Sequence, residues 1–159
     1  MKFATAGHQN YTSMDQSPYA AEVPLKMESS GFVTRYATIE KAMQACRDQK
    51  IVLSKMALIT TVKDNGDLKH RLILDCRVSG TNAATKKWER ILLPKVSDVL
   101  GDSMVLKALY RSGQEGLSYF VCDFSDAFFA VPLNPDERRY FAGRYQGHIY
   151  IWNRVIQGS

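Results

Sequence analysis

A polar turn, Asp64-Asn65-Gly66-Asp67, separates two β-like runs and constrains the fold of this chain more than any other feature. The runs extend from Met56 to Lys63 and from Leu68 to Cys76, and Asn-Gly between such runs is a strong hairpin signal. Side chains alternate along a strand, so the second run has two faces. One face carries Leu68, His70, Leu72 and Leu74, and the other carries Lys69, Arg71, Ile73 and Asp75. The sequence therefore predicts a hairpin with two cations side by side on one surface.

Other segments predict helices and a second hairpin. Thr38 is a suitable N-cap for an amphipathic helix that ends near Gln49. Gly101 separates two helical pieces, residues 95–100 and 104–110. Two further β-like runs, residues 140–145 and 148–155, are joined by a short turn and predict the second hairpin. Residues 1–37 are polar and without a period, which indicates an extended or disordered lead-in to a domain over residues 38–159.

The segment Leu117 to Phe124 is a nearly continuous apolar run, which predicts a short strand buried on both faces. Asp123 interrupts this run near its end, and Asp126 follows three residues later. A buried carboxylate needs a cation, hydrogen-bond donors or a metal ion as a partner. Alternatively, Asp123 and Asp126 cap the helical turn that follows, because Asp favours N-cap positions.

Composition narrows the class of protein. A hydrophobic content of 45% supports a packed core. No apolar run approaches the roughly 18 residues that span a bilayer, and no secretory signal is evident, so an intracellular protein is expected. The three cysteines have no metal-ligand spacing and are expected to be reduced. The net charge of +5 lies entirely in residues 38–159, which suits a nucleic-acid partner.

Residues 120–133, Phe-Val-Cys-Asp-Phe-Ser-Asp-Ala-Phe-Phe-Ala-Val-Pro-Leu, resemble motif A of reverse transcriptases from retroviruses and LTR retrotransposons. Three other segments are similar to motifs of this family. Arg71 to Arg77 resembles a fingers motif, with Cys76 in place of the usual aromatic residue. Residues 93–96 resemble the start of the next helix, and residues 150–158 resemble a hairpin that ends in Pro-Gln-Gly, with Ile156 in place of Pro.

This resemblance implies an α+β fold, the fingers and first part of the palm of a right-hand polymerase. It would contain two β-hairpins, a buried motif-A strand and packing helices. It also implies template-directed DNA synthesis, with RNA or DNA template-primer and deoxynucleoside triphosphates as partners and Mg²⁺ as cofactor. Asp123 would be the catalytic carboxylate and would bind both metal ions, with the carbonyl of Phe124 holding one of them.

The resemblance assigns the remaining roles to nucleotide and template contacts. Arg71, with Lys69 or Lys63 nearby, would bind the β- and γ-phosphates, and Arg77 would touch the template. The residues that would contact the triphosphate and its sugar are Asp126, Ala127, Phe128 and Gln157, with Phe128 as a steric gate. Four of these residues have a structural alternative: Phe128 as a core residue, Lys69 and Arg71 as solvated charges, and Arg77 as an ion-pair partner of Asp75.

The sequence contains no Asp-Asp dipeptide, so the Tyr/Phe-x-Asp-Asp hairpin of this family is not found in it. A single Asp does not hold two magnesium ions in working geometry. The chain is therefore expected to be a partial reverse transcriptase domain of a retroelement, inactive by itself. The alternatives are a non-enzymatic nucleic-acid-binding remnant of such a polymerase, and a structural domain whose likeness to motif A is accidental.

Overall fold

Two units make up the chain in the computed structural model, residues 1–85 with 126–159 and residues 86–125. The residues that the structure describes are 9–85, 94–110 and 117–156. Together they contain both helices and strands, so the structure is of the mixed α/β kind.

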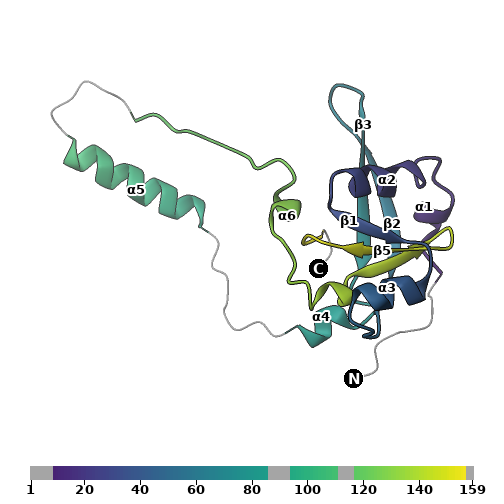
Figure 1. The fold of residues 1–159 in the computed structure, drawn as a ribbon. Helices are drawn as coiled ribbons and strands as arrows, with labels where there is room; N and C mark the ends of the chain where they lie inside the picture. Colours follow the sequence, from purple (N-terminus) through teal and green to yellow (C-terminus); the bar gives the residue numbers. More distant parts are fainter. Residues whose placement is uncertain (1–8, 86–93, 111–116, 157–159) are drawn as a thin grey trace. The chain divides into compact units, whose positions relative to one another are not determined.

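A five-stranded sheet in the order β1-β5-β4-β2-β3 forms the centre of the first unit (Figure 1). Its strands are β1 Val33–Tyr36, β2 Leu53–Val62, β3 Leu68–Asp75, β4 Ala142–Tyr145 and β5 His148–Trp152. Strand β2 pairs in parallel with β4 through Leu53 and Ser54, and it pairs antiparallel with β3 from Lys55 to Val62. The β2–β3 hairpin therefore extends beyond the rest of the sheet, as Figure 1 shows.

Both predicted hairpins are present. Gln146 and Gly147 join β4 to β5 with φ angles of 45° and 78°. Two consecutive positive φ angles define the type I′ turn, whose twist matches that of the flanking strands. In the turn between β2 and β3 the amide of Lys63 donates to the carbonyl oxygen of Asp67 at 2.8 Å, and Gly66 takes a φ of 84°. A residue with a side chain would be strained at that angle.

The prediction of an extended or disordered lead-in over residues 1–37 does not hold for the described residues 9–37. They form α1 Thr12–Asp15, α2 Glu22–Ser29 and strand β1. Met14, Ala20 and Met27 of this segment are buried against the sheet. These apolar residues are far apart and follow no helix or strand period, because each reaches the core from a different short element. A periodicity search therefore misses them.

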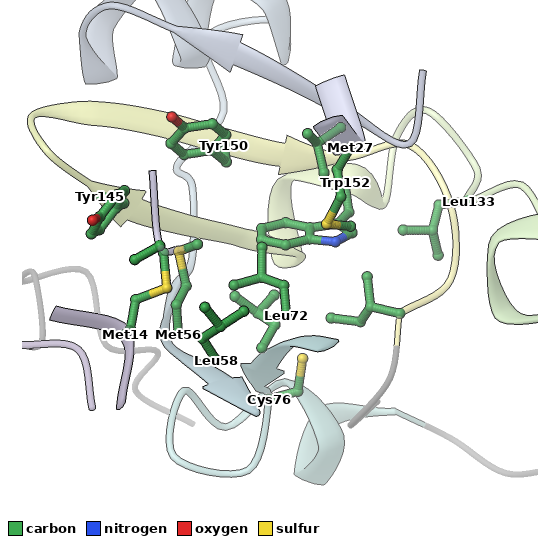
Figure 2. Packing of buried hydrophobic residues seen from close by; sticks show 14 residues of the cluster. Met14, Met27, Met56, Leu58, Leu72, Cys76, Leu133, Tyr145, Tyr150 and Trp152 are labelled. Atoms are coloured by element: carbon green, nitrogen blue, oxygen red, sulfur yellow. The ribbon is translucent and has the colours of Figure 1, made fainter. Parts of the chain in front are cut away.

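Strand β5 lies between two apolar layers. Tyr150 and Trp152 point into the larger cluster, which the N-terminal helices cover, and Figure 2 shows Met14, Met27, Met56 and Trp152 together there. Ile149 and Ile151 point to the opposite face of the sheet, where they pack with residues of α3 Ile39–Ala45. As predicted, Thr38 caps α3, and its hydroxyl accepts from the amide of Lys41 at 3.3 Å.

Helix α5, Val96–Leu109, belongs to the second unit and is continuous through Gly101. The predicted break is therefore wrong; an internal glycine costs only about 1 kcal/mol relative to Ala. The remaining helices of the described residues are shorter: α4 Thr81–Ala84, α6 Ala127–Ala130 and the 3-10 helix η1 Arg138–Tyr140. None of the helices in the described parts of the chain is long and apolar enough to cross a membrane.

The prediction of a buried strand at Leu117–Phe124 is also wrong. This segment has no regular secondary structure and pairs with no strand among the described residues. Leu117 is half-buried, and the side chains of residues 118–124 are exposed, with Phe120 at 91% and Val121 at 89% of full accessibility. A strand needs hydrogen-bonding partners on a neighbouring strand, and an apolar composition does not supply them.

Candidate functional site

The surface of the β2–β3 hairpin that faces away from the core is the first part of the candidate site. The pairs on this surface are Lys55 with Asp75, Ala57 with Ile73, Ile59 with Arg71, and Thr61 with Lys69. The core-facing pairs, such as Met56 with Leu74, lie on the opposite side. We call the surface made by these eight residues the outer face of the hairpin. Lys69 and Arg71 thus share one face, as the alternation of the sequence predicts.

Among the residues that the structure describes, neither Lys69 nor Arg71 has an acidic ion-pair partner. Lys69 is exposed and Arg71 is partly exposed. The ion pairs found among the described residues join Arg35 to Glu28 and Arg47 to Asp136, and neither involves the outer face. Two unpaired cations in neighbouring positions of one strand face repel each other, and an anion that binds both would relieve the repulsion. The arrangement is therefore suited to phosphate.

Asp75 lies in the last pair of the β2–β3 hairpin, at the end opposite the turn. One of its carboxylate oxygens, Oδ1, accepts from the amides of Arg77 and Val78 at 3.0 and 3.1 Å. The other, Oδ2, accepts from the hydroxyl of Tyr11 at 2.5 Å. The Tyr11 hydrogen bond, then the amides of Val78 and Arg77, hold the pKa of Asp75 below its usual value. Asp75 thus anchors the start of the turn that carries Arg77.

Arg77 is exposed in this turn, residues 76–80. The predicted alternative, an ion pair of Arg77 with Asp75, is not among the ion pairs found in the described residues, and Asp75 accepts instead from the backbone amide of Arg77. Buried hydroxyls hold the far side of the turn: Ser79 bonds Ser54 at 2.7 Å and Thr81 at 3.0 Å. The guanidinium of Arg77 therefore projects from a turn that is fixed at both ends.

The motif-A residues are divided between the two units. Asp126, Ala127 and Phe128 belong to the first unit, and Asp123 and Phe124 belong to the second. Asp126 has a φ of 53° and occupies the N-cap of α6, but its side chain makes no capping hydrogen bond. Its carbonyl oxygen instead accepts from the amides of Phe129 and Ala130 at 2.8 and 3.2 Å. The capping alternative for the Asp126 carboxylate is therefore not realised.

The two phenylalanines of α6 differ in their surroundings. Phe129 is half-buried and stacks on Phe32, with ring centroids 4.5 Å apart. Phe128 is 47% exposed, so the proposed steric-gate residue is not a core residue. Asp123 and Phe124 lie in the exposed segment after Leu117. Gln157 lies outside the described residues.

Among the described residues, no group of three or more His, Cys, Asp or Glu side chains is placed to hold a metal ion. Asp123 is the one carboxylate between Leu117 and Phe124. A two-metal site needs at least one further carboxylate. The described residues therefore do not by themselves fit the pair of magnesium ions that the resemblance implies.

Sequence reasoning missed the residues that support the candidate site. Tyr11 lies 64 residues before Asp75 in the chain, and Asn10 accepts from the amide of Met56 through Oδ1 at 3.0 Å. Both come from the polar N-terminal segment, in which no pattern singles them out. The buried Ser54, Ser79 and Thr81 likewise have no sequence signal, because Ser and Thr are most often exposed.

Comparison with known proteins gives a partial similarity to a retroviral protein. Over 101 residues, 63% of its length, the chain is 33% identical to a Gag-Pol polyprotein of Walleye dermal sarcoma virus. The matched stretch spans 5% of that polyprotein. No protein-family model matches the chain, and no solved structure matches it. The chain is thus similar to a small part of a retroviral polyprotein.

Proposed function

We propose that this chain is the fingers and first part of the palm of a reverse transcriptase of retrovirus or LTR-retrotransposon type. Template-directed DNA synthesis would be the activity of the complete protein. Three observations support the proposal: the order of the four motif-like segments, the similarity to a Gag-Pol polyprotein, and the unpaired cations of the outer face. The last of these carries the phosphate-binding part of the proposal.

In this proposal Lys69 and Arg71 bind phosphate. A guanidinium can donate two parallel hydrogen bonds to a phosphate group, and an ammonium adds a point charge beside it. Developing negative charge in phosphoryl transfer is stabilised by such fixed cations. Arg77 contacts the template strand, and Asp126, the amide of Ala127, Phe128 and Gln157 contact the incoming nucleotide.

Asp123 and the carbonyl of Phe124 would contribute ligands for magnesium in the complete protein. The metal would supply charge neutralisation at the phosphates. Since a second carboxylate is needed, we expect the polypeptide of these 159 residues not to extend a primer with magnesium present. Product above background in a primer-extension assay would contradict this expectation.

The phosphate role is tested by binding of a labelled oligo(dT) strand over a range of salt concentrations. On a single strand each phosphate contact contributes about 0.7 to the slope of log affinity against log salt. The double substitution Lys69→Ala/Arg71→Ala should lower the slope by about 1.4. The matched control, Lys26→Ala/Lys41→Ala, removes the same charge from the exposed faces of α2 and α3 and should leave the slope close to that of the unmodified chain. Equal slopes for the two double variants would contradict the proposal.

A second candidate is a nucleic-acid-binding remnant without polymerase activity. The observation that favours it is the lack of a three-acid cluster among the described residues. Both candidates predict the same binding result. A complementation experiment distinguishes the two candidates, because it supplies the carboxylates that this sequence lacks. The chain is mixed with the rest of a related palm, expressed as a separate polypeptide. A polymerase fragment would then extend a primer, and a remnant would not.

A further inference from the structure

The turn that carries Arg77 is held by a residue from far away in the sequence. The hydroxyl of Tyr11 donates to Oδ2 of Asp75 at 2.5 Å, while Oδ1 of the same carboxylate accepts from the amides of Arg77 and Val78. Asp75 therefore connects Tyr11 on one side to the backbone of Arg77 on the other. A carboxylate that accepts three hydrogen bonds has little freedom to rotate.

Tyr11 is itself held by contacts with β2 and with its own segment. Its amide donates to the carbonyl oxygen of Met56 at 3.0 Å. The neighbouring Asn10 bonds the amide of Met56 through its side chain, so this short segment follows the edge of β2 beyond the reach of β4. The ammonium of Lys55 lies 5.3 Å from the centre of the Tyr11 ring. Lys55 and Asp75 are also cross-strand partners on the outer face, so Tyr11 sits at the base of the same surface as Arg71 and Lys69.

We infer that Tyr11 is a positioning residue for nucleic-acid binding, acting through Asp75 to hold Arg77 against a phosphate of the bound strand. This inference rests on the proposed function, since it needs the outer face and its adjoining turn to bind nucleic acid. Without the Tyr11 hydroxyl, Asp75 keeps its two backbone bonds but loses the contact that fixes its orientation. The turn then carries Arg77 in several orientations, and the guanidinium loses more entropy when it binds.

The test compares three variants for binding of a labelled oligo(dT) strand. Tyr11→Phe keeps the ring and removes the hydroxyl, and Arg77→Ala removes the phosphate contact. Tyr19→Phe is the matched control, because Tyr19 lies in the same N-terminal segment and its ring packs on His70, while its hydroxyl does not reach Asp75. We expect Tyr11→Phe to weaken binding about threefold to tenfold, the effect of one net hydrogen bond, and to lower the salt slope by up to about 0.7, the value of one contact on a single strand. Tyr19→Phe should leave both quantities close to those of the unmodified chain.

A double-mutant cycle distinguishes positioning from a general loss of stability. If Tyr11 acts through Arg77, Tyr11→Phe should weaken binding in the unmodified chain and have almost no effect when Arg77 is already Ala. A merely structural role would weaken binding equally in both backgrounds and would leave the salt slope unchanged. Either of those results, or an inert Arg77→Ala variant, would overturn the inference. The proposed function fails separately, if Lys69→Ala/Arg71→Ala binds with an unchanged slope.

Discussion

The hydroxyl of Ser54 donates to Oγ of Ser79 at 2.7 Å, and this bond joins the start of β2 to the turn after β3 in the protein interior. Ser79 also bonds Thr81 at 3.0 Å, and Thr81 donates to the carbonyl oxygen of Tyr140 at 3.2 Å. The three buried hydroxyls of Ser54, Ser79 and Thr81 thus form hydrogen bonds with one another in the protein interior. This series of hydrogen bonds connects the hairpin, the turn of Arg77 and the segment that leads into β4.

Ser79→Ala should therefore lower the free energy of unfolding by about 1–3 kcal/mol, because it leaves the hydroxyls of Ser54 and Thr81 without a shared partner in a buried site. Chemical denaturation with circular dichroism measures the change. Ser13→Ala, at an exposed position of α1, is the control and should change the unfolding free energy by less than about 0.5 kcal/mol. Equal effects of the two substitutions would mean that the buried chain of hydroxyls does not stabilise the fold.

The absence of a side chain at Gly143 leaves room for the side chains of Met56 and Leu74. A Cβ atom at this position would lie 2.7 Å from Cγ of Met56 and 3.2 Å from Cδ1 of Leu74, both in the larger core cluster. Gly143→Ala should lower the free energy of unfolding by about 1–3 kcal/mol through overpacking. Gly101 in α5 is the contrasting position, since a Cβ atom there meets nothing within 4 Å. Gly101→Ala should raise the helical signal of the chain, and a loss of helix would contradict the continuous α5.

Local turn and cap chemistry accounts for the part of the fold that the sequence predicts. The pairs Asn65-Gly66 and Gln146-Gly147 mark the two hairpins, and Thr38 marks the start of α3, because each of these signals is complete within a few residues. The position of Lys69 and Arg71 on one face follows from the alternation along β3 in the same way.

The features that the sequence does not predict depend on partners far along the chain. Tyr11 gains its role from Asp75, and Met14 gains its burial from a sheet that forms mostly after residue 50. The converse error occurs at Leu117–Phe124, where a strong local strand pattern has no neighbouring strand among the described residues. The resemblance to motif A singles out Asp123 and Phe124 in this segment, but it gives no information about a neighbouring strand.

The Tyr11–Asp75 hydrogen bond should make stability depend on pH in the acid range. The pKa of Asp75 is lowered mainly by this bond, so its contribution is present above the unfolded value of about 3.9 and is lost as the pH falls through the lower folded value. Tyr11→Phe removes the main cause. The melting temperature of the unmodified chain should exceed that of Tyr11→Phe near pH 6, and the difference should narrow below about pH 4. A difference that stays constant with pH would show that the bond does not shift the Asp75 titration.

The cysteines give a direct test of the segment that contains Asp123. Cys122 is exposed, Cys46 is half-buried, and Cys76 is buried with a pKa raised by burial to about 11. Thiolates react and thiols do not, so Cys76 should react slowly with a thiol reagent under native conditions. Cys122 should react fastest, and Cys122→Ser should remove the fast phase. Mass spectrometry of the labelled peptides identifies the site.

The labelling result discriminates between two conformations of residues 117–124. In the structure the side chain of Cys122 is open to solvent next to Asp123, whereas in a strand buried on both faces it would be protected. We expect Cys122 to be labelled fast in the chain alone. If labelling of Cys122 slows when the rest of a related palm is added, residues 117–124 become covered on assembly. Slow labelling of Cys122 in the chain alone would instead support the buried strand that the apolar run predicts. Cys76 serves as the internal reference, because it should stay protected in both cases.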